Sequence, residues 1–247
     1  MARASAKGAS LHFQGPPPLV EAFTATPIES PAFGTLTLDA GARRVATIAP
    51  LAVEAVPAGP SATRFLVTLP ATTPPGSYTG AVQLDRERHP ITLEVHPQTN
   101  LLVAPSRLEV RAAAGAEVDV ALTLVNAGNV DFELARVHAF NLMELDAIEE
   151  TIHAALREDP APGERRLDRF VDELAARHGG LVRIGVEEGA GTISPGATQQ
   201  VRALLRLPVE LSAGATYSST WPLGNLNLSV NVFVDAATKT TRPRRSA

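Results

Sequence analysis

Short stretches in which hydrophobic and polar residues alternate recur along the whole chain. In residues 225–234, for example, Leu226, Leu228 and Val230 share one face, and asparagine and serine residues occupy the other. A period of two places one face of a β-strand in the core and the other toward solvent. The strands predicted in this way are residues 33–38, 44–48, 51–56, 64–69, 78–84, 91–95, 107–112, 117–125, 130–137, 181–186, 202–207 and 225–234. Many short strands at this spacing are typical of β-sandwiches.

Part of this pattern occurs twice. Aligning residues 57–76 with residues 195–214 without gaps gives six identities, which are Pro57, Arg64, Leu66, Leu69, Pro70 and Gly76 with Pro195, Arg202, Leu204, Leu207, Pro208 and Gly214. In both copies an alternating strand stops at a proline, which cannot donate to a ladder, and a new strand begins at a glycine followed by a tyrosine. The repeat therefore predicts one strand, crossover and strand unit in each half of the chain.

Residues 141–179 break the β pattern and predict two helices. Asn141 and Glu144 are spaced as a capping box before a first apolar stripe, and Asp159–Gly163 interrupts the helical pattern. The two stripes are Leu145, Ile148, Ile152 and Leu156, then Leu167, Phe170, Val171 and Leu174. We expect a helical hairpin inserted into the second sandwich, which either packs on a sheet as a lid or offers a surface to a partner.

The two ends of the chain differ from its centre in charge and composition. Pro16, Pro17 and Pro18 favour an extended conformation, so residues 1–30 are predicted to form an extended N-terminal arm. LHFQG within it is similar to a protease-tag remnant, which leaves open whether the first 15 residues are native. Residues 237–247 form a basic tail with Arg242, Arg244 and Arg245. Without the six basic residues of its ends, the chain has 16 basic and 26 acidic residues.

These prolines and tail arginines are therefore the candidate partner interface: Pro16, Pro17, Pro18, Arg242, Arg244 and Arg245. Basic ends on an acidic body suit contact with a neighbouring copy, with nucleic acid or with an anionic surface. Because the body is acidic and only 4% of the residues are aromatic, nucleic acid is an unlikely partner except through the tail. Short termini that simply fray are the alternative.

Two segments carry a resemblance to a known family. VDVALTLVNAGNVDFEL (118–134) reads as apolar alternation into an N-x-G-N turn, expected to join two strands as a hairpin. TISPGATQQVRALLRLPVELSAGATY (192–217) follows with a Pro-Gly opening, a strand, a proline and a Gly-x-Tyr restart. Both resemble bacterial immunoglobulin-like domains of the cell-adhesion-related and NPCBM-associated type, fairly well over residues 105–235 and more loosely over 33–96. The resemblance concerns the fold and specifies no ligand.

The predicted organisation follows from these features. The fold class is mainly β, with two tandem immunoglobulin-like β-sandwiches. The boundaries are an arm at residues 1–30, a first domain at 31–98, a second domain at 99–236 with the hairpin at 141–179, and a tail at 237–247. Composition agrees with a folded, turn-rich chain, since 45% of the 247 residues are hydrophobic and 18 glycines and 20 prolines are spread along it.

Candidate chemistry is sparse. There is no cysteine, no G-x-S-x-G elbow and no phosphate-binding glycine motif, so we predict no catalytic residue, no cofactor and no enzyme. Glu149, Glu150 and His153 are a weak candidate metal set, because a di-iron site needs a second Glu-x-x-His pair. Tyr78, Tyr217 and Trp221 could form a sugar platform, but core or corner positions explain them more simply.

The sequence thus favours a non-enzymatic structural or accessory subunit of a larger assembly, such as a virion, a tail-like particle or a shell. It would contact other protein subunits, copies of itself among the alternatives, through its arm, hairpin and tail. Residues 1–15 lack the apolar run of a secretory signal and no stretch is long enough to span a membrane, so we expect a cytoplasmic or virion-like location rather than export. The alternative is an envelope-associated binding or spacer module that recognises carbohydrate or protein.

Overall fold

The computed structural model describes residues 10–24, 32–38, 51–58, 62–84, 87–145, 149–153 and 165–236. The chain divides into two compact β units. The first consists of Met1–Asn100, Asn126–Phe132 and Ser194–Ala197, and the second of Leu101–Val125, Glu133–Ile193 and Thr198–Ala247.

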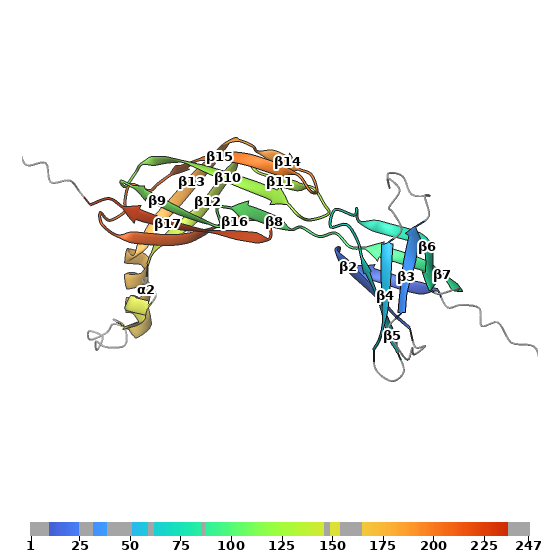
Figure 1. Ribbon diagram of the computed structural model, residues 1–247. Coiled ribbons are helices and arrows are strands. Elements are labelled where there is room, and N and C mark those ends of the chain that lie inside the picture. The colour runs from blue at the N-terminus through green and yellow to red at the C-terminus, as the bar shows by residue number, and fades with distance from the viewer. Residues whose placement is uncertain are drawn as a thin grey trace, which may run out of the picture. The chain divides into compact units, whose positions relative to one another are not determined.

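Seven strands of the first unit close into a barrel. They are β1 (Leu11–Gly15), β2 (Leu19–Thr24), β3 (Ala32–Leu38), β4 (Leu51–Pro57), β5 (Thr63–Thr68), β6 (Gly76–Leu84) and β7 (Glu87–Val95). Their order around the barrel is β1-β2-β5-β4-β3-β6-β7, and Figure 1 labels β2 to β7 of this unit. Closure comes from β1, which pairs antiparallel with β2 and parallel with β7.

Inward-facing residues of every strand build the core of this barrel. Phe13 and Phe65 meet edge to face with ring centroids 6.4 Å apart, and Val20, Val53 and Leu93 are fully buried beside them. Each of these residues lies two positions from another buried residue of its strand. The alternation in the sequence is therefore the cause of the buried face.

The second unit contains an eight-stranded sheet in the order β8-β10-β15-β13-β12-β16-β17-β9. Its strands are β8 (Leu101–Ala104), β9 (Arg107–Ala112), β10 (Glu117–Asn126), β12 (Val137–Glu144), β13 (His178–Glu188), β15 (Thr198–Arg206), β16 (Thr216–Leu223) and β17 (Leu226–Val234). A separate small sheet pairs β11 (Phe132–Leu134) with β14 (Gly191–Ile193). The single described helix with assigned bounds is α2 (Arg166–Ala176).

Both units have the same strand order. The series β2-β5-β4-β3-β6-β7 corresponds position by position to β10-β15-β13-β12-β16-β17. In the second unit the role of β1 is divided, because β8 pairs with the strand equivalent to β2 and β9 runs parallel to β17. The repeated segments predicted from the sequence are β5 with β6 and β15 with β16, which occupy equivalent positions. The predicted class, mainly β with two units resembling tandem immunoglobulin-like domains, is confirmed.

The predicted extended arm is wrong for residues 11–24, which form β1 and β2 of the barrel. Leu11 and Phe13, like Val20 and Ala22, alternate with polar or exposed neighbours and are buried in the core. Pro16, Pro17 and Pro18 lie in the turn between these two strands, where proline costs no ladder hydrogen bond. Pro17 is itself buried, whereas Pro16 and Pro18 are exposed, so contact of these two residues with a partner stays a prediction.

Two further local predictions are corrected. Asn141 and Glu144 do not cap a helix, because β12 continues through Glu144 and pairs with both β13 and β16. Residues 126–129 do not join two paired strands, since β10 pairs with β15 and the next strand, β11, pairs with β14. Asn126 and Asn129 are instead buried, and their amides bind backbone groups.

The two repeated tyrosines are core corner residues, as the sequence predicts. The Tyr78 hydroxyl donates to the carbonyl of Pro74 at 2.7 Å, and the Tyr217 hydroxyl accepts from the amide of Ser212 at 3.0 Å. Both rings are buried. Each tyrosine therefore ties the start of its strand to the loop that precedes it, as in the tyrosine corner of immunoglobulin-like sandwiches.

Replacing Tyr78 with phenylalanine should lower the free energy of unfolding by about 1 kcal/mol near neutral pH, because one buried hydrogen bond is lost. Burial also raises the pKa of the Tyr78 hydroxyl above its ordinary value of 10.0. The unfolded chain then ionises first, so the native tyrosine loses stability as the pH rises above about 10 and the difference from phenylalanine shrinks. Urea unfolding at about pH 8 and about pH 11 measures both effects. A constant difference between the two proteins would contradict this account.

Candidate functional site

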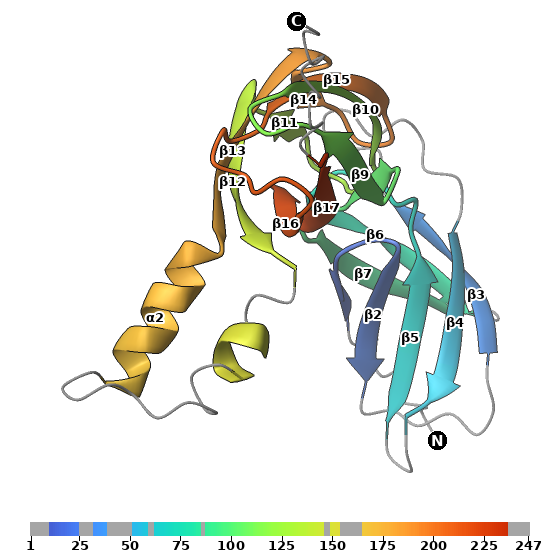
Figure 2. The same ribbon diagram turned by 90° about the vertical axis from the view of Figure 1, so that its left-hand side faces the viewer.

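The helical segment of the second unit stands clear of its sheet. Figure 2 shows α2 running away from the strands in line with the start of β13, beside the helical residues 149–153. We call α2 and residues 149–153 together the helical projection. The described part of this insert is therefore not folded back as a lid on the sheet, because α2 joins the strands where the pairing of β12 with β13 ends at Met143 and His178.

A cluster of charges holds the base of the projection. Arg177, which follows α2, forms ion pairs with Glu150 and, at 3.8 Å, with Glu144 at the end of β12. The amide of Glu144 also donates to the carbonyl of Arg177 at 3.1 Å. Along the helix, Arg169 pairs with Glu173 at 3.2 Å. The contacts of Arg177 join one end of the helix to the strands. The face of α2 opposite the Arg169–Glu173 pair remains uncovered.

That opposite face is apolar with an acidic edge. Leu167 and Val171, one helical turn apart, are 68% and 53% exposed. Asp168 and Asp172, the residues next to them, are also exposed. Phe170 and Leu174 of the predicted stripe are half-buried, and Leu145 and Ile152 are further exposed apolar residues of this region. Three large exposed hydrophobic residues lie on the projection itself, which is unlike isolated surface leucines.

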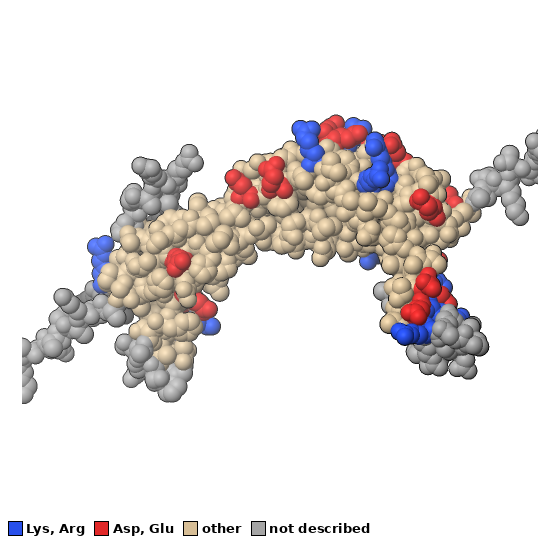
Figure 3. All heavy atoms as spheres, turned by 180° about the vertical axis from the view of Figure 1, so that it is seen from behind, with Lys and Arg blue, Asp and Glu red and all other residues tan. Residues whose placement is uncertain are grey.

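The outer face of the sheet carries an interleaved set of charges. Arg202 on β15 lies 3.4 Å from Asp119 and 3.4 Å from Glu188, and 3.8 Å from Glu187. Arg206 on the same strand pairs with Glu117 at 2.9 Å. In the view of Figure 3 basic and acidic side chains lie next to one another rather than in separate fields. Exposed pairs of this kind contribute little to stability individually.

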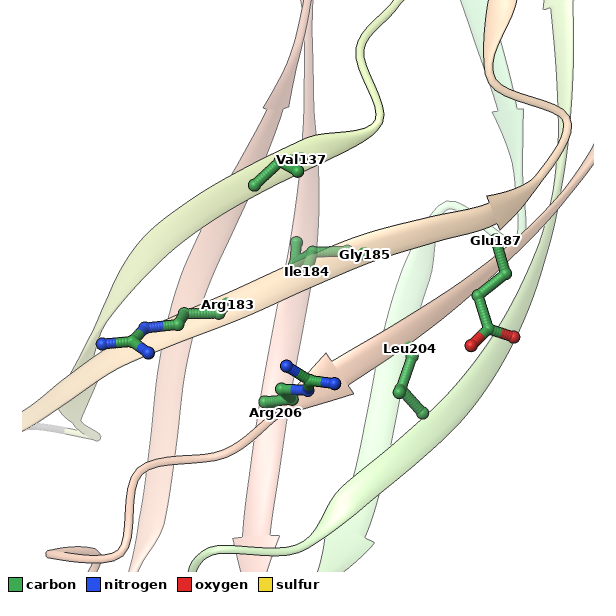
Figure 4. Close-up of a pocket in the computed structure, with 7 residues that line it drawn as sticks. All are labelled: Val137, Arg183, Ile184, Gly185, Glu187, Leu204 and Arg206. Atoms are coloured by element: carbon green, nitrogen blue, oxygen red, sulfur yellow. The ribbon is translucent and has the colours of Figure 1, made fainter.

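A hollow of about 250 Å³ opens within this charged face. Figure 4 shows its lining residues on β12, β13 and β15, which are Val137, Arg183, Ile184, Gly185, Glu187, Leu204 and Arg206. Its floor lies at Gly185, whose position would allow a Cβ atom without any neighbour within 4 Å. The hollow therefore exists because this outward strand position has no side chain.

The residues singled out from the sequence are not brought together in the described structure. Arg242, Arg244 and Arg245 lie outside the described residues, and the three prolines lie in a turn of the first unit. Glu149 and His153 form an exposed pair at 3.8 Å, whereas Glu150 binds Arg177. In the described ranges no three His, Asp or Glu residues are grouped to hold a metal ion. None of the described helices is both long and apolar enough to cross a membrane.

Trp221 and the two tyrosines form no exposed platform. Trp221 is fully buried and contacts the ring of His138 edge to face at 5.4 Å, and both tyrosines are core residues. Sequence reasoning missed the hollow at Gly185. The alternation does place Arg183 and Gly185 on the outward face of a strand, but which residues lie beside them depends on the pairing of β13 with β12 and β15.

Comparisons with known proteins provide information about the fold and not about the function. No protein-family model matches the chain, and no curated protein is similar to it. Among solved structures it is similar to S-layer protein SbsC domains 4 and 5, with 14% identity and a TM-score of 0.27, covering 66% of this chain and 66% of that one.

Two further solved structures are similar to this chain at a comparable level. The adhesin InvE of Yersinia pseudotuberculosis has 12% identity and a TM-score of 0.25, covering 91% of this chain and 58% of that one. The titin domains I67–I69 have 8% identity and a TM-score of 0.33, covering 93% and 64%. These are distant likenesses to tandem immunoglobulin-like domains, and they identify no ligand or partner for this chain.

Proposed function

We propose that this chain is a non-enzymatic structural subunit of a larger protein assembly, and that its helical projection binds the basic C-terminal segment of a neighbouring copy. The observation that carries this proposal is the uncovered stripe of Leu167 and Val171 with Asp168 and Asp172 beside it. Such a surface suits a partner that offers both apolar contact and positive charge.

The apolar part of the surface supplies the driving force. Covering a leucine or valine side chain contributes about 1.5–3 kcal/mol, so a partner that covers Leu167 and Val171 gains several kcal/mol before the cost of ordering. Both residues are exposed, and neither takes part in the ion pairs at the base of the projection. A segment from another molecule can therefore reach them without displacing contacts within the unit.

The acidic part of the surface selects the partner. Residues 236–247 contain Lys239, Arg242, Arg244 and Arg245 and no acidic residue. Arginine lays its aliphatic stem along apolar surface while its guanidinium binds carboxylates, so this segment can cover the stripe and pair with Asp168 and Asp172. A second copy of the helix itself fits less well, because like-charged aspartates would flank both faces.

The last strand, β17, ends near the point where the helical projection begins, which supports contacts from one copy to the next. The Val234 carbonyl accepts from the amide of Gly214, and the Leu145 amide donates to the carbonyl of Thr216. β17 therefore ends at the edge of the unit from which the projection leaves. Each copy then offers a donor segment and an acceptor surface at the same end.

Light scattering after size-exclusion chromatography tests the proposal on the full chain. We expect concentration-dependent oligomers that weaken at high salt, and we expect them to be lost, by about tenfold or more in dissociation constant, when residues 236–247 are deleted or in Asp168→Lys/Asp172→Lys. Adding Arg242→Glu, Arg244→Glu and Arg245→Glu to the lysine variant should restore them.

The matched control is Glu109→Lys/Glu210→Lys, which changes the net charge equally at exposed positions elsewhere in the second unit. This control should keep the oligomers at moderate salt. A chain that stays monomeric at all concentrations, or oligomers that are indifferent to both the deletion and the aspartate substitutions, would overturn the proposal. A chain that stays monomeric because its C-terminal segment binds its own α2 would also overturn the proposal.

A second function, a binding module that recognises a carbohydrate, is favoured by one specific observation. The hollow at Gly185 combines a strand position without a side chain with two arginines, Arg183 and Arg206, on an exposed sheet face. It does not involve the helical projection, so the two functions can be tested separately.

A further inference from the structure

We infer that the hollow at Gly185 binds a sugar unit that carries a carboxylate, of the uronic acid type, with Arg183 and Arg206 on the carboxylate and Glu187 on the hydroxyl groups. This inference rests on the second of the two proposed functions and is independent of the assembly through the helical projection.

The floor of the hollow has the shape and polarity of a surface that accepts the C–H face of a sugar ring. Gly185 lies directly between Val137 on β12 and Leu204 on β15 in the strand register. Val137 is 75% exposed, and Leu204 is half-buried. Two apolar side chains therefore flank a flat patch of bare backbone about one residue wide.

Positive charge gathers at one end of this floor. Arg183 and Arg206 are direct cross-strand partners on β13 and β15. Like charges placed opposite one another destabilise a sheet unless something neutralises them. Arg206 already binds Glu117 at 2.9 Å, whereas no carboxylate of the described residues lies within 4 Å of Arg183. Arg183 is therefore the member of the pair for which the described residues supply no anion.

A bound carboxylate would pair with Arg183 in the geometry that arginine prefers. Figure 4 shows the Arg206 side chain over β15, where it pairs with Glu117 of β10, and the Arg183 side chain turned away from the hollow. Arg183 is exposed, so a change of rotamer that brings its planar fork toward the carboxylate meets no packed neighbour. Side-chain changes of this size are common on binding.

The opposite end of the hollow offers a hydrogen-bond acceptor. Glu187 lies there, 3.8 Å from Arg202, and an ionised carboxylate can only accept hydrogen bonds. A uronic acid has its carboxylate at one edge of the ring, hydroxyl donors at the other and a C–H face between them. A neutral sugar lacks the first of these groups, and a simple fatty acid lacks the second.

Titration of the full chain with glucuronate, glucose and acetate, followed by NMR chemical shifts, tests the inference. We expect glucuronate to bind in the millimolar range, typical of a shallow site for one sugar, and about tenfold more tightly than glucose or acetate. The shifts should centre on β13 and β15. Equal binding of glucuronate and acetate would reduce the hollow to a general anion site and overturn the inference, as would equal binding of glucose.

Two variants remove the site in different ways while sparing the fold. Arg183→Gln removes the unpaired charge, and Gly185→Val fills the hollow, which has room for a Cβ at a strand position that suits a branched residue. Each should weaken glucuronate binding about tenfold or more. Arg64→Gln, an exposed arginine of the first unit, is the matched control and should bind normally. Asp168→Lys/Asp172→Lys should also bind normally, so failure of this site and failure of the assembly proposal are distinguishable.

Discussion

Replacing Asn129 with alanine should lower the free energy of unfolding of the first unit by about 3 kcal/mol. The Asn129 side chain is 3% exposed, and its Nδ2 donates to the carbonyls of Thr73 at 3.0 Å and His96 at 2.9 Å. Its Oδ1 accepts from the amide of Gln98 at 2.6 Å. Alanine would leave three backbone groups without their partner, and a buried unsatisfied group costs about 1–3 kcal/mol.

Hydrogen exchange during urea unfolding can locate this loss. We expect the amides of β6 and β7, in the first unit, to exchange at lower urea concentrations in Asn129→Ala than in the native chain. The control is Asn227→Ala at an exposed position of β17, which should change the free energy of unfolding by less than about 0.5 kcal/mol. Similar effects of both substitutions would show that the buried amide network does not stabilise the unit.

Strands were predictable from the sequence wherever one face of the strand is buried and the other is exposed to solvent. Residues 107–112 form β9 with the predicted bounds, and residues 51–56 lie within β4. In both strands exposed residues alternate with buried ones over most of the length, which is the signal that alternation carries. The predicted strand at residues 44–48 lies outside the described residues. The predicted strand at 130–137 is interrupted, because β11 ends at Leu134 and β12 begins at Val137.

The strands that escaped prediction depend on distant partners. β1 pairs Leu11 with Ile91 and Phe13 with Leu93, about eighty residues along the chain. Nothing local distinguishes such a short segment from an extended arm, and the proline run beside it favours that reading. The same limit applies to Asn129, whose local N-x-G-N context is typical of a turn but whose role is set by contacts with Thr73 and His96.

The candidate surfaces show the same division between local and long-range information. Helical spacing identifies Leu167 and Val171 as an apolar stripe, but spacing cannot say whether a sheet covers the stripe. The continuation of β13 into the base of α2 decides this question. The hollow at Gly185 is harder to predict from the sequence than the stripe, because it is defined by the register of three strands that are separate in sequence.

Trp221 offers a second large effect, located in the second unit. Trp221→Ala should lower the free energy of unfolding by about 4 kcal/mol, because it removes the largest fully buried side chain and leaves a cavity opposite Leu228. The contact between its ring and His138, with centroids 5.4 Å apart, would also be lost. Exchange of the β16 and β17 amides should report the change, together with circular dichroism in urea.

Trp221→Phe separates the loss of volume from the loss of a polar group. Among the described residues the indole Nε1 has no hydrogen-bond partner, so its burial carries a cost that phenylalanine does not. Phenylalanine keeps an aromatic edge near His138 and leaves a smaller cavity. We therefore expect a loss of about 1 kcal/mol for phenylalanine against about 4 kcal/mol for alanine. Nearly equal losses would mean that the indole N–H finds a partner in solution and that its bond, rather than packing, accounts for the effect.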